Sequence, residues 1–284
     1  MEYLINLEGA VLGFCVKNHY IDCLCKKKLQ KIDKDSGKVV CEKKIFEKEG
    51  FAKILLADEK QIFVSDFCTL YLLQEEDYEI VGKWKIGEDL SSDICGMAVD
   101  EKRIYCSIRN GKIITVDRDS FVQREYSVAD SSMWSLQLYE NCLLCGTVDG
   151  QLLLLDRETM SLREKLVLSK QNIRSLFVDD KILYAASQDK KLFQIDLSEF
   201  EIRKVQKNVH KKMFDCVGSY EDMLVTVSYP SSEIALWNKN TLEKCKEMEV
   251  PLSLSGNAYI EENRMYITSR NILGIGCVDL KNIQ

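Results

Sequence analysis

The chain has 284 residues, of which 46% are hydrophobic and 30% are charged, a balance that excludes an intrinsically disordered protein. The net charge of −6 argues against nonspecific nucleic-acid binding, which needs a basic surface. The apolar runs are short, as in residues 152–155, so none provides the roughly 20 residues of a membrane-spanning helix. The first eight residues carry two acids and no base, unlike a signal peptide.

The cysteine content is high, with 12 cysteines in the chain. A chain of this size can build its own apolar core without a disulfide framework. We therefore expect reduced and mostly buried thiols and a cytoplasmic location. We also expect a monomer, with no membrane insertion and no nucleic-acid partner.

Seven segments of the chain share one pattern, in which an apolar strand, a polar turn and a second apolar strand end on a polar residue. The segments span residues 20–33, 62–74, 104–117, 142–156, 182–196, 223–238 and 265–279. Their closing residues are Asp33, Gln74, Asp117, Asp156, Asp196, Asn238 and Asp279. The closing residues are 41, 43, 39, 40, 42 and 41 positions apart, which identifies a structural repeat.

Each repeat is predicted to form four strands, as the fourth shows most clearly. Its strands are expected at residues 134–138, 142–146, 152–155 and 162–168, with a hairpin turn at Asp149-Gly150. Short strands at this spacing predict an all-β fold, a seven-bladed β-propeller of four-stranded antiparallel blades in one domain over residues 1–284. The last repeat lacks a fourth strand, so residues 3–7 are expected to complete it and close the ring.

Several of these hairpins resemble known propeller repeats. Residues 144–156, 185–196 and 234–238, the last reading Ile-Ala-Leu-Trp-Asn, resemble the WD40-type repeat. Residues 29–40 are closer to the repeat of quinoprotein-like propellers. The Gly-His dipeptide and the Trp-Asp ending of the WD40 family are absent, so the buried His–Asp network of that family is not expected.

No set of catalytic, metal-binding or cofactor-binding residues is evident. The two histidines, His19 and His210, fall in different parts of the predicted blades and are both expected at the surface. Cys23 and Cys25 lack the spacing of a zinc site, and packing is the expected role of the cysteines. Five aspartates are expected near one rim, where they could together bind a cation: Asp66, Asp93, Asp149, Asp189 and Asp215. Asp149 and Asp189 occupy turn positions that Asp favours for local hydrogen bonds, and this explanation is preferred to a cation site.

The loops before strand a and between strands b and c of each blade should meet on one face around a central channel. Partner-binding residues are predicted there at Phe67, Arg109, Trp134, Arg174, Phe214, Tyr229 and Arg270. Aromatic and Arg residues are typical of interface hot spots. Phe51, Met133 and Met213 lie in the same loops but suit packing between blades. The predicted function is a non-catalytic scaffold for a protein or peptide, and the alternative is a small-molecule lyase or hydrolase with a carboxylate or metal site at the channel mouth.

Overall fold

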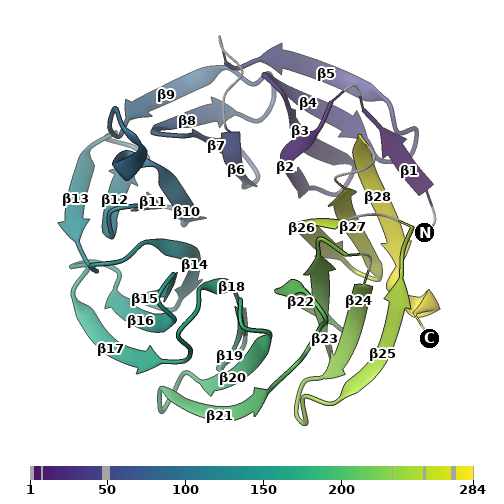
Figure 1. The fold of residues 1–284 in the computed structure, drawn as a ribbon. Coiled ribbons are helices and arrows are strands. Elements are labelled where there is room, and N and C mark those ends of the chain that lie inside the picture. Colours follow the sequence, from purple (N-terminus) through teal and green to yellow (C-terminus); the bar gives the residue numbers. More distant parts are fainter. Residues whose placement is uncertain are drawn as a thin grey trace.

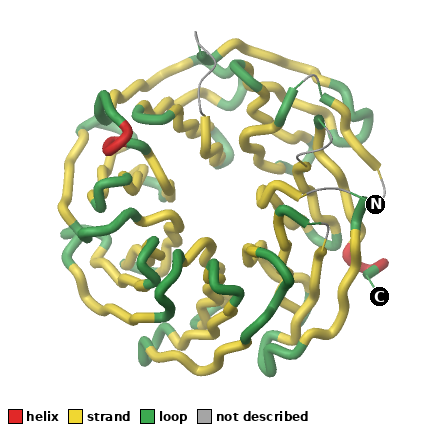
Figure 2. Tube along the Cα trace, in the orientation of Figure 1, coloured by secondary structure: helices red, strands yellow, loops and turns green. Residues whose placement is uncertain are grey.

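The computed structural model describes residues 3–7, 9–46, 52–231, 233–251, 254–269 and 273–283. These residues form seven four-stranded antiparallel sheets, arranged as blades around a common axis (Figure 1). Nearly all regular structure in this part of the chain is strand, with turns between the strands and two short 3-10 helices, η1 (Leu90–Ser92) and η2 (Leu280–Asn282) (Figure 2). The prediction of a seven-bladed β-propeller is confirmed.

Each blade runs from an innermost strand a to an outermost strand d. The a strands are β2 (Val11–Val16), β6 (Ala52–Ala57), β10 (Ile94–Val99), β14 (Met133–Tyr139), β18 (Ile173–Asp179), β22 (Met213–Tyr220) and β26 (Leu254–Glu261). The b strands are β3 (Tyr20–Cys25), β7 (Gln61–Asp66), β11 (Arg103–Ile108), β15 (Cys142–Thr147), β19 (Ile182–Ser187), β23 (Met223–Tyr229) and β27 (Arg264–Ser269). The c strands are β4 (Lys28–Asp33), β8 (Thr69–Gln74), β12 (Lys112–Asp117), β16 (Gln151–Asp156), β20 (Lys191–Asp196), β24 (Glu233–Asn238) and β28 (Gly274–Asp279). The d strands are β5 (Val39–Lys44), β9 (Ile80–Lys85), β13 (Gln123–Ser127), β17 (Leu162–Val167), β21 (Glu201–Gln206), β25 (Lys244–Glu249) and, in the seventh blade, β1 (Tyr3–Asn6).

The closing residue of each repeat is the last residue of strand c in every blade. In most blades its polar side chain accepts hydrogen bonds from the turn that follows strand c. Asp117 Oδ1 accepts hydrogen bonds from the backbone N–H and the hydroxyl of Ser120, at 2.8 and 2.7 Å. Asp156 does the same with Thr159, at 2.8 and 3.0 Å. The repeat in the sequence is therefore a repeat of turn chemistry.

The N-terminal strand closes the ring as predicted. β1 pairs antiparallel with β28, with Tyr3 opposite Cys277 and Asn6 opposite Gly274. Ile5 is 3% exposed and lies in an apolar cluster with residues of the first and seventh blades. The backbone N–H of Leu7 extends the pairing to the carbonyl of Leu273 at 2.9 Å. The two ends of the described chain are thereby joined in one blade, and the outer edge of β28 is covered.

A recurring contact, which we name the blade latch, joins neighbouring blades on the side of the a–b turns. The latch residue directly follows the end of strand c. The seven latch residues are Lys34, Glu75, Arg118, Arg157, Leu197, Lys239 and Leu280. The backbone N–H of each donates to a carbonyl in or beside the a–b turn of its own blade, as from Arg118 to Lys102 at 2.8 Å. This bond holds the latch side chain toward the preceding blade.

The chemistry of the blade latch differs from one boundary to the next. Four latch cations pair with a carboxylate of the preceding blade: Lys34 with Glu261 at 2.5 Å, Arg118 with Asp58 at 2.5 Å, Arg157 with Asp100 at 3.5 Å and Lys239 with Asp179 at 2.7 Å. At the boundary of the first two blades the signs are reversed, and Glu75 faces Lys17 at 3.5 Å. At the two remaining boundaries, between the fourth and fifth and between the sixth and seventh blades, the latch is apolar, because Leu197 shares a cluster with Tyr139, and Leu280 shares one with Tyr220.

Candidate functional site

The predicted binding face is built where the b–c turns meet the loops that precede strand a. A backbone hydrogen bond recurs there, from Arg109 to Asp93 at 2.9 Å, from Val148 to Ser132 at 2.9 Å and from Gln188 to Asn172 at 2.8 Å. The two sets of loops are thus held together near the inner strands by the same contact in three consecutive blades. Side chains in these positions are carried by a rigid scaffold.

Four of the predicted site residues occupy one repeat position, immediately after the sixth residue of strand b: Phe67, Arg109, Tyr229 and Arg270. Phe67 is half-buried, and the Arg109 side chain is 43% exposed. Tyr229 is 3% exposed, so its ring packs inside the molecule and does not offer an open surface. Arg270 lies outside the described residues, as does Phe51.

Arg109 is fixed in place by Asp93, a residue that was predicted only as a member of a possible cation site. The Nη2 atom of Arg109 donates to Asp93 Oδ2 at 2.6 Å, and the Asp93 side chain is completely buried. This bond raises the pKa of Arg109 above its usual value. The Ser132 hydroxyl also donates to the Arg109 carbonyl, at 2.5 Å. Arg109 therefore presents an exposed guanidinium whose positive charge is balanced by the buried Asp93 carboxylate.

Trp134 and Arg174 occupy equivalent bulge positions on the adjacent strands β14 and β18. In β14 the pairing runs from Met133 opposite Thr147 directly to Ser135 opposite Gly146, so Trp134 is left out of the ladder. Arg174 is skipped in the same way in β18. A bulge redirects a side chain away from the sheet. Trp134 is consequently 40% exposed, an unusual state for a tryptophan on an innermost strand.

Phe214, predicted from the sequence as a partner-binding residue, is not exposed on this face. Phe214 pairs with Ser228, the register that Met133 has in its own blade, and its side chain is fully buried. In β22 the bulge comes later, between Cys216 and Gly218. Asp215 follows Phe214 as Trp134 follows Met133, although Asp215 is paired with Val227 and is not bulged. The residue of the sixth blade that is equivalent to Met133 is thus Phe214 and not Met213.

Asp215 and Arg174 form a contact across the fifth and sixth blades. Arg174 Nε lies 3.5 Å from Asp215 Oδ1, and the guanidinium carbon lies 4.9 Å from the centroid of the Tyr229 ring. The Asp215 side chain is only 15% exposed, and this burial raises its pKa to about 6. Arg174 and Tyr229 partly offset the rise. Trp134, Arg174, Asp215 and Tyr229 are called the mouth cluster below.

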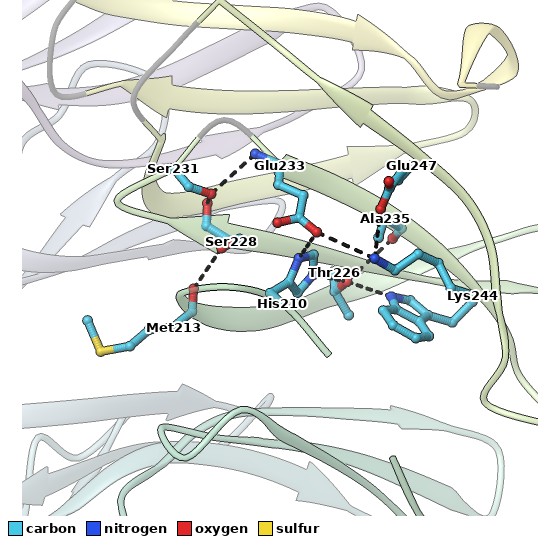
Figure 3. A network of polar contacts seen from close by, with 10 residues as sticks. His210, Met213, Thr226, Ser228, Ser231, Glu233, Ala235, Lys244 and Glu247 are labelled. Atoms are coloured by element: carbon cyan, nitrogen blue, oxygen red, sulfur yellow. Dashed lines mark hydrogen bonds and ion pairs between the residues drawn. The ribbon is translucent and has the colours of Figure 1, made fainter. Parts of the chain in front are cut away.

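His210 is buried, which corrects the expectation of a surface residue. Its Nδ1 lies 2.8 Å from Glu233 Oε1, and its Nε2 lies 2.7 Å from the Thr226 hydroxyl (Figure 3). The same hydroxyl accepts a hydrogen bond from Trp237 Nε1 at 2.8 Å. The sixth blade thus has a buried His–acid network, with Glu233 as the acid, although the Gly-His dipeptide is missing.

The Thr226 hydroxyl of the Glu–His–Thr arrangement in the sixth blade is not available as a nucleophile. Thr226 is fully buried, and its oxygen already receives the Trp237 N–H, so it has no access to a substrate. Burial lowers the pKa of His210, against the opposing effect of Glu233. A cleft of about 670 Å³ opens beside the network, lined by Lys190, Lys211 and Lys244 together with Glu233, Glu247 and Glu249. The cleft therefore carries charged side chains of both signs, and two of them, Lys244 and Glu247, pair with each other at 2.7 Å.

The rim aspartates have separate polar partners. Asp149 accepts from the Ser131 hydroxyl at 2.8 Å, and Asp189 pairs with Lys191 at 2.5 Å. Within the described ranges, no three or more His, Cys, Asp or Glu side chains are arranged to hold a metal ion. The cysteines whose side chains are described are all free thiols. No helix in the described part of the chain is long and apolar enough to cross a membrane.

No protein-family model matches the chain, and a sequence search of curated proteins finds no match. Solved structures are similar in fold. The β-propeller domain of Cps50 (Swd1) from Myceliophteria thermophila is 12% identical with a TM-score of 0.80, covering 96% of this chain and 98% of that one. The WD40 β-propeller domain of Doa1 is 11% identical with a TM-score of 0.79, covering 95% and 93%. The computationally designed Ika8 protein is 10% identical with a TM-score of 0.73, covering 96% and 97%. Together with the seven blades, these likenesses establish that the chain has the fold of the WD40-like β-propellers.

Proposed function

We propose that the chain is a non-catalytic scaffold that binds a protein or peptide partner through the face formed by the d–a and b–c loops. The observation that carries the proposal is Trp134, a 40% exposed indole held by a bulge on an innermost strand. Arg174 lies in the equivalent position of the next blade, and Arg109 is exposed in the blade before. Rigid aromatic and Arg side chains provide contact area at little cost in conformational entropy.

Other properties of the proposed scaffold follow from composition. We propose a single domain over residues 1–284 that acts as a monomer in the cytoplasm. The free thiols support a reducing compartment. The net charge of −6 supports a protein partner over a nucleic acid.

The test is a binding measurement with two variants of the mouth cluster and one control. A partner captured from the source cell is purified, and its affinity is measured by calorimetry. Trp134→Ala and Arg174→Ala should each weaken binding by about 2 kcal/mol or more, roughly 30-fold. Leu162→Ala is the matched control, because Leu162 is 52% exposed on the outermost strand β17. Equal affinity for the parent and both mouth variants would exclude this face as the binding site.

A further inference from the structure

The mouth cluster holds an arginine whose outer nitrogens are unused. Arg174 Nε lies 3.5 Å from Asp215 Oδ1 as an ion pair, and the guanidinium lies over the Tyr229 ring, so the group is contacted from two sides. No described residue accepts a hydrogen bond from its two terminal nitrogens. The side chain is 22% exposed, which leaves these donors open to a ligand. A preoriented arginine with free donors is a recognition element for an oxygen acceptor.

The charge around this arginine determines which acceptor fits. Asp215 lies 3.5 Å from Arg174 Nε, so the pair has no net charge when both groups are ionised. Arg109, two blades away in the third blade, is likewise balanced by Asp93, at 2.6 Å. A partner carboxylate that approached Arg174 would also approach Asp215 and be repelled by it. An uncharged carbonyl takes the same hydrogen bonds without that repulsion.

Trp134 adds a flat, exposed surface on the adjacent innermost strand. The Ser135 hydroxyl donates to the Ile173 carbonyl at 3.0 Å, so the residues adjoining Trp134 and Arg174 are bonded to each other across the two blades. The exposed indole and the guanidinium therefore lie on adjacent strands. A planar amide can contact the indole while its oxygen accepts from Arg174.

We propose that the mouth cluster recognises a carboxamide side chain, Asn or Gln, of the partner peptide and that Asp215 excludes the isosteric Asp or Glu. The inference rests on the proposed function, because it specifies what the same face binds. Arg174 supplies the donors, Trp134 the contact surface and Asp215 the discrimination. Asp215 is thus a specificity-determining residue, and one that the sequence indicated only as a possible cation ligand.

The experiment uses a random heptapeptide library displayed on phage, selected at pH 7.5 on the immobilised full chain. Peptides that lose binding to Trp134→Ala are retained and synthesised with each Asn or Gln replaced by Asp or Glu. At one position the exchange should weaken binding to the parent protein at least 10-fold. In Asp215→Asn the same exchange should cost less than 3-fold. Asp189→Asn is the matched control, since it removes a carboxylate of the same face outside the cluster, and it should retain the full penalty.

The outcomes separate the two proposals. Retained peptides that carry Asp or Glu at the discriminating position, or an equal penalty in the parent and Asp215→Asn, would overturn the inference and leave the scaffold intact. If no selected peptide depends on Trp134, the proposed function fails, and the inference fails with it. Melting temperatures of the variants within a few degrees of the parent show that a changed preference is not due to unfolding.

Discussion

Replacing Asp215 with Asn should change how the stability of the propeller depends on pH. The pKa of this carboxyl group is raised from 3.8 to about 6 because it is buried. The folded state therefore binds more protons than the unfolded state between about pH 4 and pH 6. Over that window the contribution of Asp215 to the free energy of unfolding falls as the pH rises. The Asn side chain does not titrate, so the variant lacks this loss.

The size of the effect follows from the shift itself. About two pKa units at 1.36 kcal/mol each give a penalty near 3 kcal/mol for the ionised carboxylate well above pH 6. Because part of the penalty is already present at pH 4, the free energy of unfolding of Asp215→Asn minus that of the parent should increase by about 2 kcal/mol from pH 4 to pH 7.5. The other carboxylates titrate in both proteins and cancel in the difference.

Urea unfolding followed by far-ultraviolet circular dichroism at pH 4, 5, 6 and 7.5 measures this difference directly. Asp189→Asn is again a suitable control, because the pKa of Asp189 is lowered and its variant should show the opposite trend. A difference for Asp215→Asn that stays flat or decreases with pH would refute the assignment of a desolvated carboxylate to the mouth cluster.

Three further results are expected. Ile5→Ala should destabilise the protein by about 3 kcal/mol, because it leaves a cavity where the ring closes. The control Asn6→Ala, at an exposed residue of the same strand, should change the melting temperature little. Equal effects of the two substitutions would contradict closure by this strand. Cys245 is exposed and should react with a thiol reagent within minutes while the buried thiols stay protected, and several native disulfides in a mass spectrum would contradict reduced, buried thiols. A double-mutant cycle of Arg118→Ala and Asp58→Ala should give a coupling energy near 1 kcal/mol, and additive effects would show that this blade latch contributes no energy of its own.

The fold could be predicted because its signals are local. Each repeat ends on a side chain such as Asp117 that caps a turn three residues away, so the period is visible in the sequence. The site was harder, because its geometry depends on which residue is left out of a strand pairing. Trp134 and Phe214 both follow a Met near the start of strand a, yet one is bulged outward and the other is buried. The pairing with strand b determines which residue is bulged, and the local sequence of strand a does not predict that pairing.

His210 shows the same difficulty at longer range. Its partners Thr226 and Glu233 come from two other strands of the sixth blade, 16 and 23 positions along the chain. A histidine between a valine and two lysines resembles a surface residue when only its sequence neighbours are considered. Burial and pairing follow from the way the loop before β22 folds over the blade.

The varied chemistry of the blade latch means that the seven blades are not interchangeable. A propeller of near-identical units risks forming with a blade out of order or borrowed from a second molecule. In this chain a second blade placed after the third would set Glu75 against the carboxylate of Asp100. A fifth blade placed there would instead pack the apolar Leu197 against the charged Asp100. The reversed latch at Glu75 and the apolar latches at Leu197 and Leu280 thus penalise blades that belong at the four cation–carboxylate boundaries. Moving the chain termini to another blade boundary would preserve every such pairing, whereas exchanging two blades would break several at once.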